Sequence, residues 1–206
     1  VMSCSLVQRG ALPLLPEAVR TRSALTCGAD LVFALPAPCA CAGAEAFARA
    51  GVALLAAAGC DGLVFGAETP DAALLMEAAE LLDSDSYRAA LKAQLAGGAR
   101  SFAAARQAAA AELASDERVA ALLDKPNNNL AVEYCRAIRS LSPRMEAYPL
   151  PRQGANHGEA LHSAHGQFAS ASALRKLWAE GGADAVAPYV PEAVFPLYQE
   201  AYAAGQ

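Results

Sequence analysis

Residues 167–182, QFASASALRKLWAEGG, place two small hydroxyl side chains just before a helical pattern that has an arginine in its first turn. Ser170 is a good N-cap, and the first backbone N–H groups of a helix lack internal partners, so an anion is favoured there. Because helical side chains lean toward the N-terminus, Arg175 reaches back over Ser172. These three residues form a candidate phosphate cradle. The alternative, an ordinary capped helix that packs through its leucines and Trp178, is favoured by this stretch alone.

Three other turns offer residues that could complete such a site. In PNNN, either Asn127 or Asn128 caps the following helix in the simplest interpretation, while a second amide can hydrogen-bond a ribose hydroxyl or a base edge. Gly66 follows the run GLVF, where a glycine lets the backbone approach a ligand or simply ends a strand in a turn. Arg152 follows YPLP, where an arginine is either solvated or pairs bidentately with a polyphosphate.

Other chemistries receive less support. The histidines, His157, His162 and His165, lie in a stretch rich in glycine and alanine, which favours solvated loop histidines over a zinc site, and we predict no metal site. The sequence contains no P-loop, no G-x-G-x-x-G and no Ser-His-Asp order. Six cysteines without a C-x-x-C pair favour reduced thiols in a cytoplasmic protein.

The composition of the chain limits the fold and the partners that are compatible with these residues. A chain of 206 residues predicts one domain, and the 55% hydrophobic content consists largely of alanine in short stretches broken by charge. No stretch has the roughly 18 consecutive apolar residues that a membrane span needs, so we expect no membrane partner. The net charge of −5 argues against DNA as a partner and confines any nucleic-acid role to a local patch.

The pattern along the chain predicts a parallel α/β fold. Residues 27–36 and 59–68 each read as a helix stop followed by a buried strand, and the helical pattern between them makes a β–α–β unit with a right-handed crossover. Residues 70–124 read as a helical insertion of three or four helices that open with Ser, Asp or Pro. Residues 144–152 alternate like a strand with prolines at its end. A last helix lies within residues 188–206.

Between the insertion and that strand, residues 125–141 read as a further helix, whose apolar side carries Leu130, Tyr134, Ile138 and Leu141. In open parallel sheets, ligands bind beyond the carboxyl ends of the strands, where loops meet helix N-termini. Four stretches are candidates for that rim: residues 8–10, 65–68, 126–128 and 170–172. Their convergence predicts a nucleotide site.

With these stretches in view, the chain resembles the bacterial tRNA(Met) cytidine acetate ligase family of the nucleotidyltransferase-like α/β superfamily. The resemblance is carried, in family order, by VMS…VQRG, GADLVFALP, AEAFARAGVALLAAAGCDGLVFGAE, KPNNNLAVEY with the later Arg152, and FASASALRK. It implies a Rossmann-like three-layer parallel sheet with a helical insertion at about 70–124. Residues 1–206 would form one nucleotide-binding domain, with 188–206 as the start of a C-terminal helical region.

The resemblance also implies a site and a reaction. An ATP site would include Gly66, Asn127 (or Asn128) and Arg152, and the superfamily's serine-rich motif beside the triphosphate would correspond to Ser170, Ser172 and Arg175. The implied reaction activates acetate with ATP, helped by Mg²⁺, to acetyl-adenylate. The wobble cytidine of elongator tRNA(Met) then takes the acetyl group, so ATP, acetate and tRNA(Met) are the implied partners.

The sequence departs from the family pattern in two ways. The family's H-x-G-H loop is not present, so the catalytic residues are unassigned and we expect an incomplete catalytic domain. Glu17 stands where the family carries a lysine. Two alternatives therefore stay open: an adenylyl- or cytidylyltransferase that acts on a small metabolite, and a nucleotide-binding module without turnover.

Overall fold

The computed structural model describes residues 1–4, 6–7, 10, 12–99, 101–152 and 169–205. The chain groups into two compact units, which we call the central unit (residues 42–152) and the terminal unit (residues 1–41 and 153–206). Each unit is described by itself below. The expectation of one domain over 1–206 stays a prediction.

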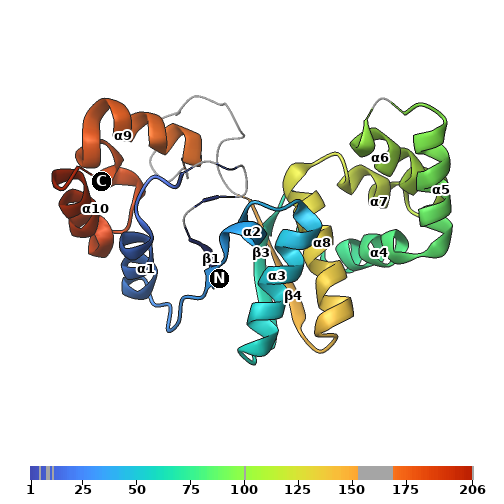
Figure 1. The fold of residues 1–206 in the computed structure, drawn as a ribbon, viewed down its shortest axis with the longest axis horizontal. Coiled ribbons are helices and arrows are strands. Elements are labelled where there is room, and N and C mark those ends of the chain that lie inside the picture. Colours follow the sequence, from blue (N-terminus) through green and yellow to red (C-terminus); the bar gives the residue numbers. More distant parts are fainter. Residues whose placement is uncertain (5, 8–9, 11, 100, 153–168, 206) are drawn as a thin grey trace. The chain divides into compact units, whose positions relative to one another are not determined.

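The central unit combines a small parallel sheet with a layer of helices (Figure 1). Its elements are α3 (Ala44–Ala57), β3 (Gly62–Ala67), α4 (Ala72–Asp83), α5 (Asp85–Ala96), α6 (Phe102–Leu113), α7 (Glu117–Leu122), α8 (Pro126–Leu141) and β4 (Glu146–Pro151). α8 packs against α3, α4 and the sheet, which makes it the central helix of this unit.

β3 and β4 pair in parallel over their full length, from Gly62 opposite Glu146 to Ala67 opposite Pro151. The side chains of β3 alternate, so that Leu63, Phe65 and Ala67 are buried while those at the intervening positions are exposed. This period of two is typical of a strand that packs one face on a core. The buried face joins a hydrophobic cluster built mainly from α4, α7 and α8.

The pairing differs from the β–α–β unit expected for residues 27–36 and 59–68. β2 is only Ala34–Leu35 and pairs in parallel with β1 (Met2–Ser3), whereas β3 pairs with β4. The crossover between paired strands in the central unit therefore runs from β3 to β4 and contains α4–α8. β2 is short because Pro36 follows it directly, and proline has no N–H to donate to a ladder.

The helices expected over residues 70–124 are present as α4–α7, and each begins where a capping residue predicted it. The side chains of Asp71, Ser84, Ser101 and Asp116 each accept a hydrogen bond from a backbone N–H in the first turn of their helix, at 2.9–3.1 Å. Because these caps satisfy N–H groups that have no partner within the helix, short polar side chains fix where the helices start.

The terminal unit contains β1, β2, α1 (Glu17–Thr26), α2 (Ala37–Ala40), α9 (Ala171–Val186) and α10 (Phe195–Ala203), with 3-10 turns at Ala187–Tyr189 and Glu192–Val194. Trp178 packs against Tyr198 and Tyr202 with nearly perpendicular rings. This confirms that α9 packs through Trp178. Gly182 has a φ of 68° and kinks α9, and a Cβ there would lie 2.6 Å from the Tyr202 ring.

Two general features follow from the described residues. None of their helices is long and apolar enough to cross a membrane. All six cysteines are free thiols; Cys135 is buried, whereas Cys27 and Cys41 are exposed.

Candidate functional site

The carboxyl ends of β3 and β4 lie side by side, because the two strands run parallel and in register to their last residues. The backbone N–H of Arg152 continues the ladder by donating to the Ala67 carbonyl at 3.1 Å. Glu68 follows β3 at the same edge. Side chains that leave two adjacent parallel strands therefore meet at one place, the edge where α/β proteins bind ligands.

α8 begins at this edge, and its first turn is capped from a distance. Lys125 occupies the N-cap position without a side-chain cap, and Pro126 is the first helical residue. The Glu68 carboxylate takes the place of the cap: it accepts hydrogen bonds from the backbone N–H groups of Asn127 at 3.2 Å and Asn128 at 2.7 Å, and from the Asn127 Nδ2 at 2.6 Å.

These bonds correct the simplest interpretation of PNNN, in which an asparagine caps its own helix. Proline has no N–H and its fixed φ suits the first helical position, so the N-cap falls on Lys125. Asn127 and Asn128 then lie inside the first turn, where their N–H groups need an acceptor from elsewhere. Glu68 supplies it.

Glu68 is held as a carboxylate. Partial burial pushes its pKa upward, but the hydrogen bonds from the Asn127 side chain and from the Asn127 and Asn128 backbone outweigh burial, and the pKa lies below its ordinary value. A negative charge at the positive end of α8 is also favoured by the helix dipole. The N-terminus of α8 is therefore already neutralised by the protein itself.

Gly66, Asn127 and Arg152 lie together at this edge of the sheet. Arg152 Nη1 donates to Asn127 Oδ1 at 3.3 Å, and a Cβ placed on Gly66 would lie 3.6 Å from Arg152 Cγ. Gly66 belongs to β3 itself, on its exposed face, rather than to a turn after the strand. The missing side chain leaves that face open beside the arginine.

Asn128 is placed differently from Asn127, although it is the next residue along the chain. Its side chain is only 1% exposed, and both ends are used: Oδ1 accepts from the Thr69 N–H at 2.9 Å and Nδ2 donates to Thr69 Oγ1 at 3.1 Å. Asn128 thus ties α8 to the loop after β3. Of the two asparagines, Asn127 is the one whose side chain reaches Arg152.

The serine-rich motif lies in the terminal unit. Ser170 caps α9, with its Oγ accepting from the Ala173 N–H at 3.2 Å, as its sequence position predicted. Ser172 and Arg175 lie in the first turns of α9, and both are exposed. The motif thus combines an exposed guanidinium with a capped helix start, and its phosphate role stays a proposal.

Several sequence predictions fall outside the described residues: the three histidines, and Gln8 and Arg9 of the first rim stretch. Across the residues that are described, no three His, Cys, Asp or Glu side chains are arranged to hold a metal ion. The residue that sequence reasoning missed is Glu68. It lay within a rim stretch, and an acid directly after a buried strand was the available signal.

Comparisons with known proteins cover the whole chain. The family model described as HIGH Nucleotidyl Transferase matches residues 1–206. A tRNA(Met) cytidine acetate ligase of Syntrophotalea carbinolica is 40% identical over 183 residues, 88% of this chain and 43% of the relative. One of Caldanaerobacter subterraneus subsp. tengcongensis is 34% identical over 209 residues, all of this chain and 51% of the relative.

Two solved structures of a related protein are also similar to this chain. A crystal structure of Thermotoga maritima TmcAL bound with alpha-thio ATP matches with a TM-score of 0.84 at 29% identity, covering 99% of this chain and 48% of that one. An apo form of the same protein matches with a TM-score of 0.88 at 30% identity, covering 99% of this chain and 49% of that one. These matches confirm a nucleotidyltransferase-like α/β fold, and the chain spans about half the length of the relatives it matches. The chain belongs to the HIGH nucleotidyl transferase family.

Proposed function

We propose that the chain is the nucleotide-binding part of an ATP-dependent ligase that acetylates the wobble cytidine of elongator tRNA(Met). The names of the relatives support the tRNA substrate, and the alpha-thio ATP bound by the Thermotoga maritima protein supports the nucleotide. The observation that carries the proposal is the pairing of Arg152 with Asn127 beside the open face at Gly66.

In the proposed site, Arg152 contacts the phosphates of ATP. Its guanidinium is exposed and offers five N–H donors, of which the contact to Asn127 uses one. Asn127 orients that guanidinium, as Glu68 holds the asparagine amide by its Nδ2. Since Glu68 already neutralises the start of α8, we assign the phosphates to Arg152 and not to that helix end.

The proposed reaction has two steps that need no nucleophile from the protein. An acetate oxygen attacks the α-phosphorus, the bond to the bridging oxygen breaks, and pyrophosphate leaves with the electron pair. The exocyclic amine of cytidine then attacks the acetyl carbon, AMP leaves, and the amine loses a proton. The first step brings two anions together, so cationic donors aimed at the phosphates lower its barrier.

The serine motif enters the proposal as a second source of phosphate donors. Ser170, Ser172 and Arg175 would contact the triphosphate, with the arginine supplying the positive charge. Mg²⁺ enters only as an ion carried by the triphosphate, because both oxygens of Glu68 already accept hydrogen bonds.

The decisive experiment measures pyrophosphate release by the intact protein with ATP and each candidate acceptor. Release that requires acetate, followed by transfer of labelled acetyl to a tRNA(Met) transcript, is the expected result. Release driven by a phosphorylated metabolite instead of acetate would identify a nucleotidyltransferase. ATP binding without any release would identify a binding module.

A further inference from the structure

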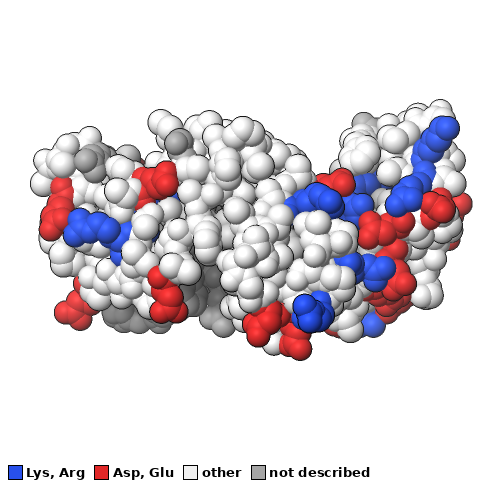
Figure 2. All heavy atoms as spheres, turned by 60° about the horizontal axis from the view of Figure 1, so that its bottom comes forward, with Lys and Arg blue, Asp and Glu red and all other residues white. Residues whose placement is uncertain are grey.

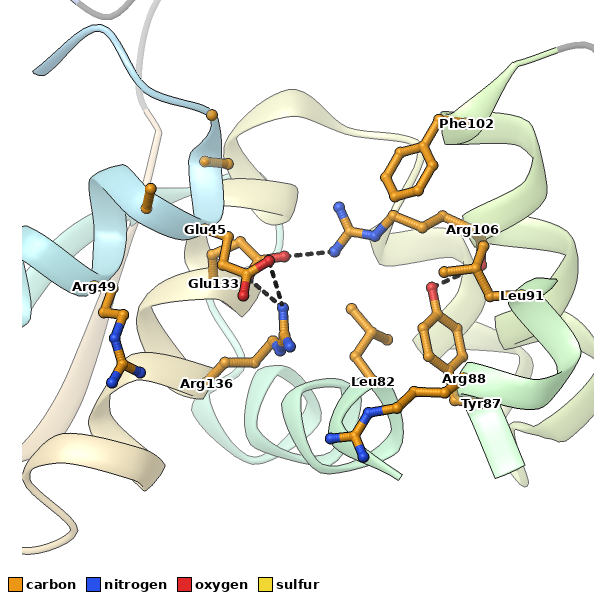
Figure 3. A pocket seen from close by; sticks show the side chains of 13 residues that line it. Glu45, Arg49, Leu82, Tyr87, Arg88, Leu91, Phe102, Arg106, Glu133 and Arg136 are labelled. Atoms are coloured by element: carbon orange, nitrogen blue, oxygen red, sulfur yellow. Dashed lines mark hydrogen bonds and ion pairs between the residues drawn. The ribbon is translucent and has the colours of Figure 1, made fainter. Parts of the chain in front are cut away.

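A pocket of about 560 Å³ lies in the central unit away from the candidate site (Figure 3). The start of α3, the end of α4, α5, the start of α6 and the middle of α8 supply its walls. Gly66, Asn127 and Arg152 are not among its lining residues. Its volume lies within the range of about 300–1,000 Å³ that is typical of small-molecule sites.

Arginines outnumber carboxylates among the residues that line this pocket, although Asp83 and Asp85 pair with two of these arginines. Four arginines line it against two glutamates; the arginines are Arg49, Arg88, Arg106 and Arg136, and the glutamates are Glu45 and Glu133. Figure 2 shows basic and acidic side chains interleaved on the surface, so the pocket offers individual guanidinium groups rather than part of a broad basic face. A local patch is what a protein with a net charge of −5 needs in order to bind a polyanion.

Glu133 fixes two of these arginines. Its side chain is 3% exposed, and its two oxygens accept from Arg106 Nη2 and from Arg136 Nη1, both at 2.7 Å. Arg136 also donates from Nε to Asp83 at 2.8 Å, which ties α8 to the end of α4. With its carboxylate used twice, Glu133 acts as an internal support that holds the guanidinium groups in place. Figure 3 shows Arg106 pointing toward Glu133 across the pocket.

Arg88, an exposed arginine of this pocket, can change its ion-pair partner. Arg88 has a side chain that is 64% exposed, and its ion pair is with Asp85, whose side chain is 97% exposed. Ion pairs between exposed side chains contribute at most about 1 kcal/mol, so Arg88 can exchange this partner for an incoming phosphate at little cost.

An exposed aromatic ring completes the pocket. Phe102 is the first residue of α6 and is 61% exposed, although it lines the pocket. Below it in Figure 3 lie the buried side chains of Leu82 and Tyr87. An exposed aromatic face beside guanidinium groups is the arrangement with which proteins stack unpaired bases while contacting the adjoining phosphate.

We propose that this pocket binds one unpaired nucleotide of the RNA substrate, with its base stacked on Phe102 and its phosphodiester contacted by Arg88. The inference rests on the proposed function, because it takes the RNA from there. α8 links the two sites: Asn127 in its first turn faces Arg152, and Arg106 in the pocket donates to Asn129 two residues further along, at 3.5 Å.

The test measures binding of a fluorescent tRNA(Met) transcript to the intact protein over a series of salt concentrations. Phe102→Ala should weaken binding at least about fivefold through lost stacking. Phe102→Leu should weaken it by a similar factor, because leucine keeps the apolar bulk but has no aromatic face. Arg88→Gln should lower the slope of log Kd against log salt by about 0.7, the value expected for one contact to single-stranded phosphate.

Arg118→Gln is the matched control. The Arg118 side chain is 67% exposed and pairs with an acid close in sequence, Asp116, as Arg88 does with Asp85, but Arg118 lies outside the pocket. This variant should bind tRNA with the wild-type affinity and slope. The melting temperature and the ATP affinity of the Phe102 and Arg88 variants should stay at wild-type values, since both side chains are exposed.

The outcomes separate this inference from the proposed function. Wild-type tRNA affinity and slope in both the Phe102 and Arg88 variants would overturn the pocket while leaving the ligase proposal intact. A wild-type protein that binds ATP but not tRNA would overturn both. If cytidine monophosphate competed as effectively as RNA, the ligand of the pocket would be a free nucleotide, and the inference would be overturned. If polyglutamate competed in a way that depended on Phe102, the ligand would be an acidic protein, which would also overturn it.

Discussion

Arg152 and Asn127 meet at 3.3 Å between Nη1 and Oδ1, although one follows β4 and the other lies in the first turn of α8. The contact exists because β4 ends beside β3, and Glu68 at the end of β3 holds the start of α8. A guanidinium and an amide are thereby presented at one edge of the sheet, with a carboxylate behind them.

Removal of this guanidinium should weaken ATP binding. We predict that Arg152→Ala raises the Kd for ATP at least about tenfold, because a charge-assisted contact to phosphate is lost. Isothermal titration calorimetry on the intact protein measures this. Arg144→Ala is the matched control, since Arg144 is also exposed but precedes β4 at the opposite end of the strand. An equal Kd in the two variants would remove Arg152 from the site.

Substitution of the two adjacent asparagines should have different effects, mainly on stability for Asn128 and mainly on ATP binding for Asn127. Asn128→Ala should lower the free energy of unfolding by about 1–3 kcal/mol, because the buried Thr69 contacts lose their partner. Asn127→Ala should change it by no more than about 1 kcal/mol while weakening ATP binding, since its amide orients Arg152. Urea denaturation and calorimetry on both variants check this; a larger loss of ATP affinity in Asn128→Ala than in Asn127→Ala would reverse the assignment.

Glu68 should make stability depend on pH in the acid range. Its pKa in the folded protein lies below the ordinary value of 4.5, so the carboxylate stabilises the fold above about pH 4.5 and loses this effect as the pH falls through the folded pKa. The stability difference between wild type and Glu68→Gln should therefore be largest near pH 7 and shrink toward pH 3. Urea titrations at several pH values measure it, with Glu112→Gln, which removes an exposed carboxylate of α6, as the control. A difference that is constant from pH 7 to pH 3 would contradict the proposed capping by the carboxylate.

Cys135 should be chemically inert in the folded protein. Its side chain is fully buried at 0% exposure, and burial raises the pKa of the thiol to about 12. Iodoacetamide at pH 8 should therefore leave Cys135 unmodified while alkylating the exposed Cys27, and unfolding in urea should make both reactive. Mass spectrometry of the digested protein distinguishes them, and native labelling of Cys135 would show that α8 opens readily.

Local signals predicted much of this fold. Short polar residues such as Ser101 and Asp116 marked helix starts, because they accept hydrogen bonds from N–H groups of their own first turn. The general rule for parallel sheets placed residues 65–68 and 126–128 at one rim, whereas the grouping of Arg152 with Gly66 and Asn127 came from the family resemblance. The helix starts and the shared rim need only a few neighbouring residues or a general rule of topology.

The features that the sequence did not predict involve contacts between residues that are far apart in the chain. The cap of α8 comes from Glu68, fifty-nine residues before Asn127, and the residues around the start of α8 do not indicate it. The apolar side predicted for α8 included Ile138, which is buried, but Glu133 is buried as well. α8 packs against several elements at once, so its buried surface is wider than one stripe and includes a charge that two arginines neutralise.

The pairing of β3 with β4 across α4–α8 has a consequence for biosynthesis. Gly62 cannot meet Glu146 until every helix between them has left the ribosome, so the sheet has a high contact order and closes late. During that interval the nascent chain carries an apolar strand, with Phe65 at its centre, that lacks its β4 partner. An unpaired apolar strand of this kind can pair with strands of other chains and start aggregation. Rapid formation of α4–α8, which cover β3, is therefore a condition for reaching the native state without aggregation.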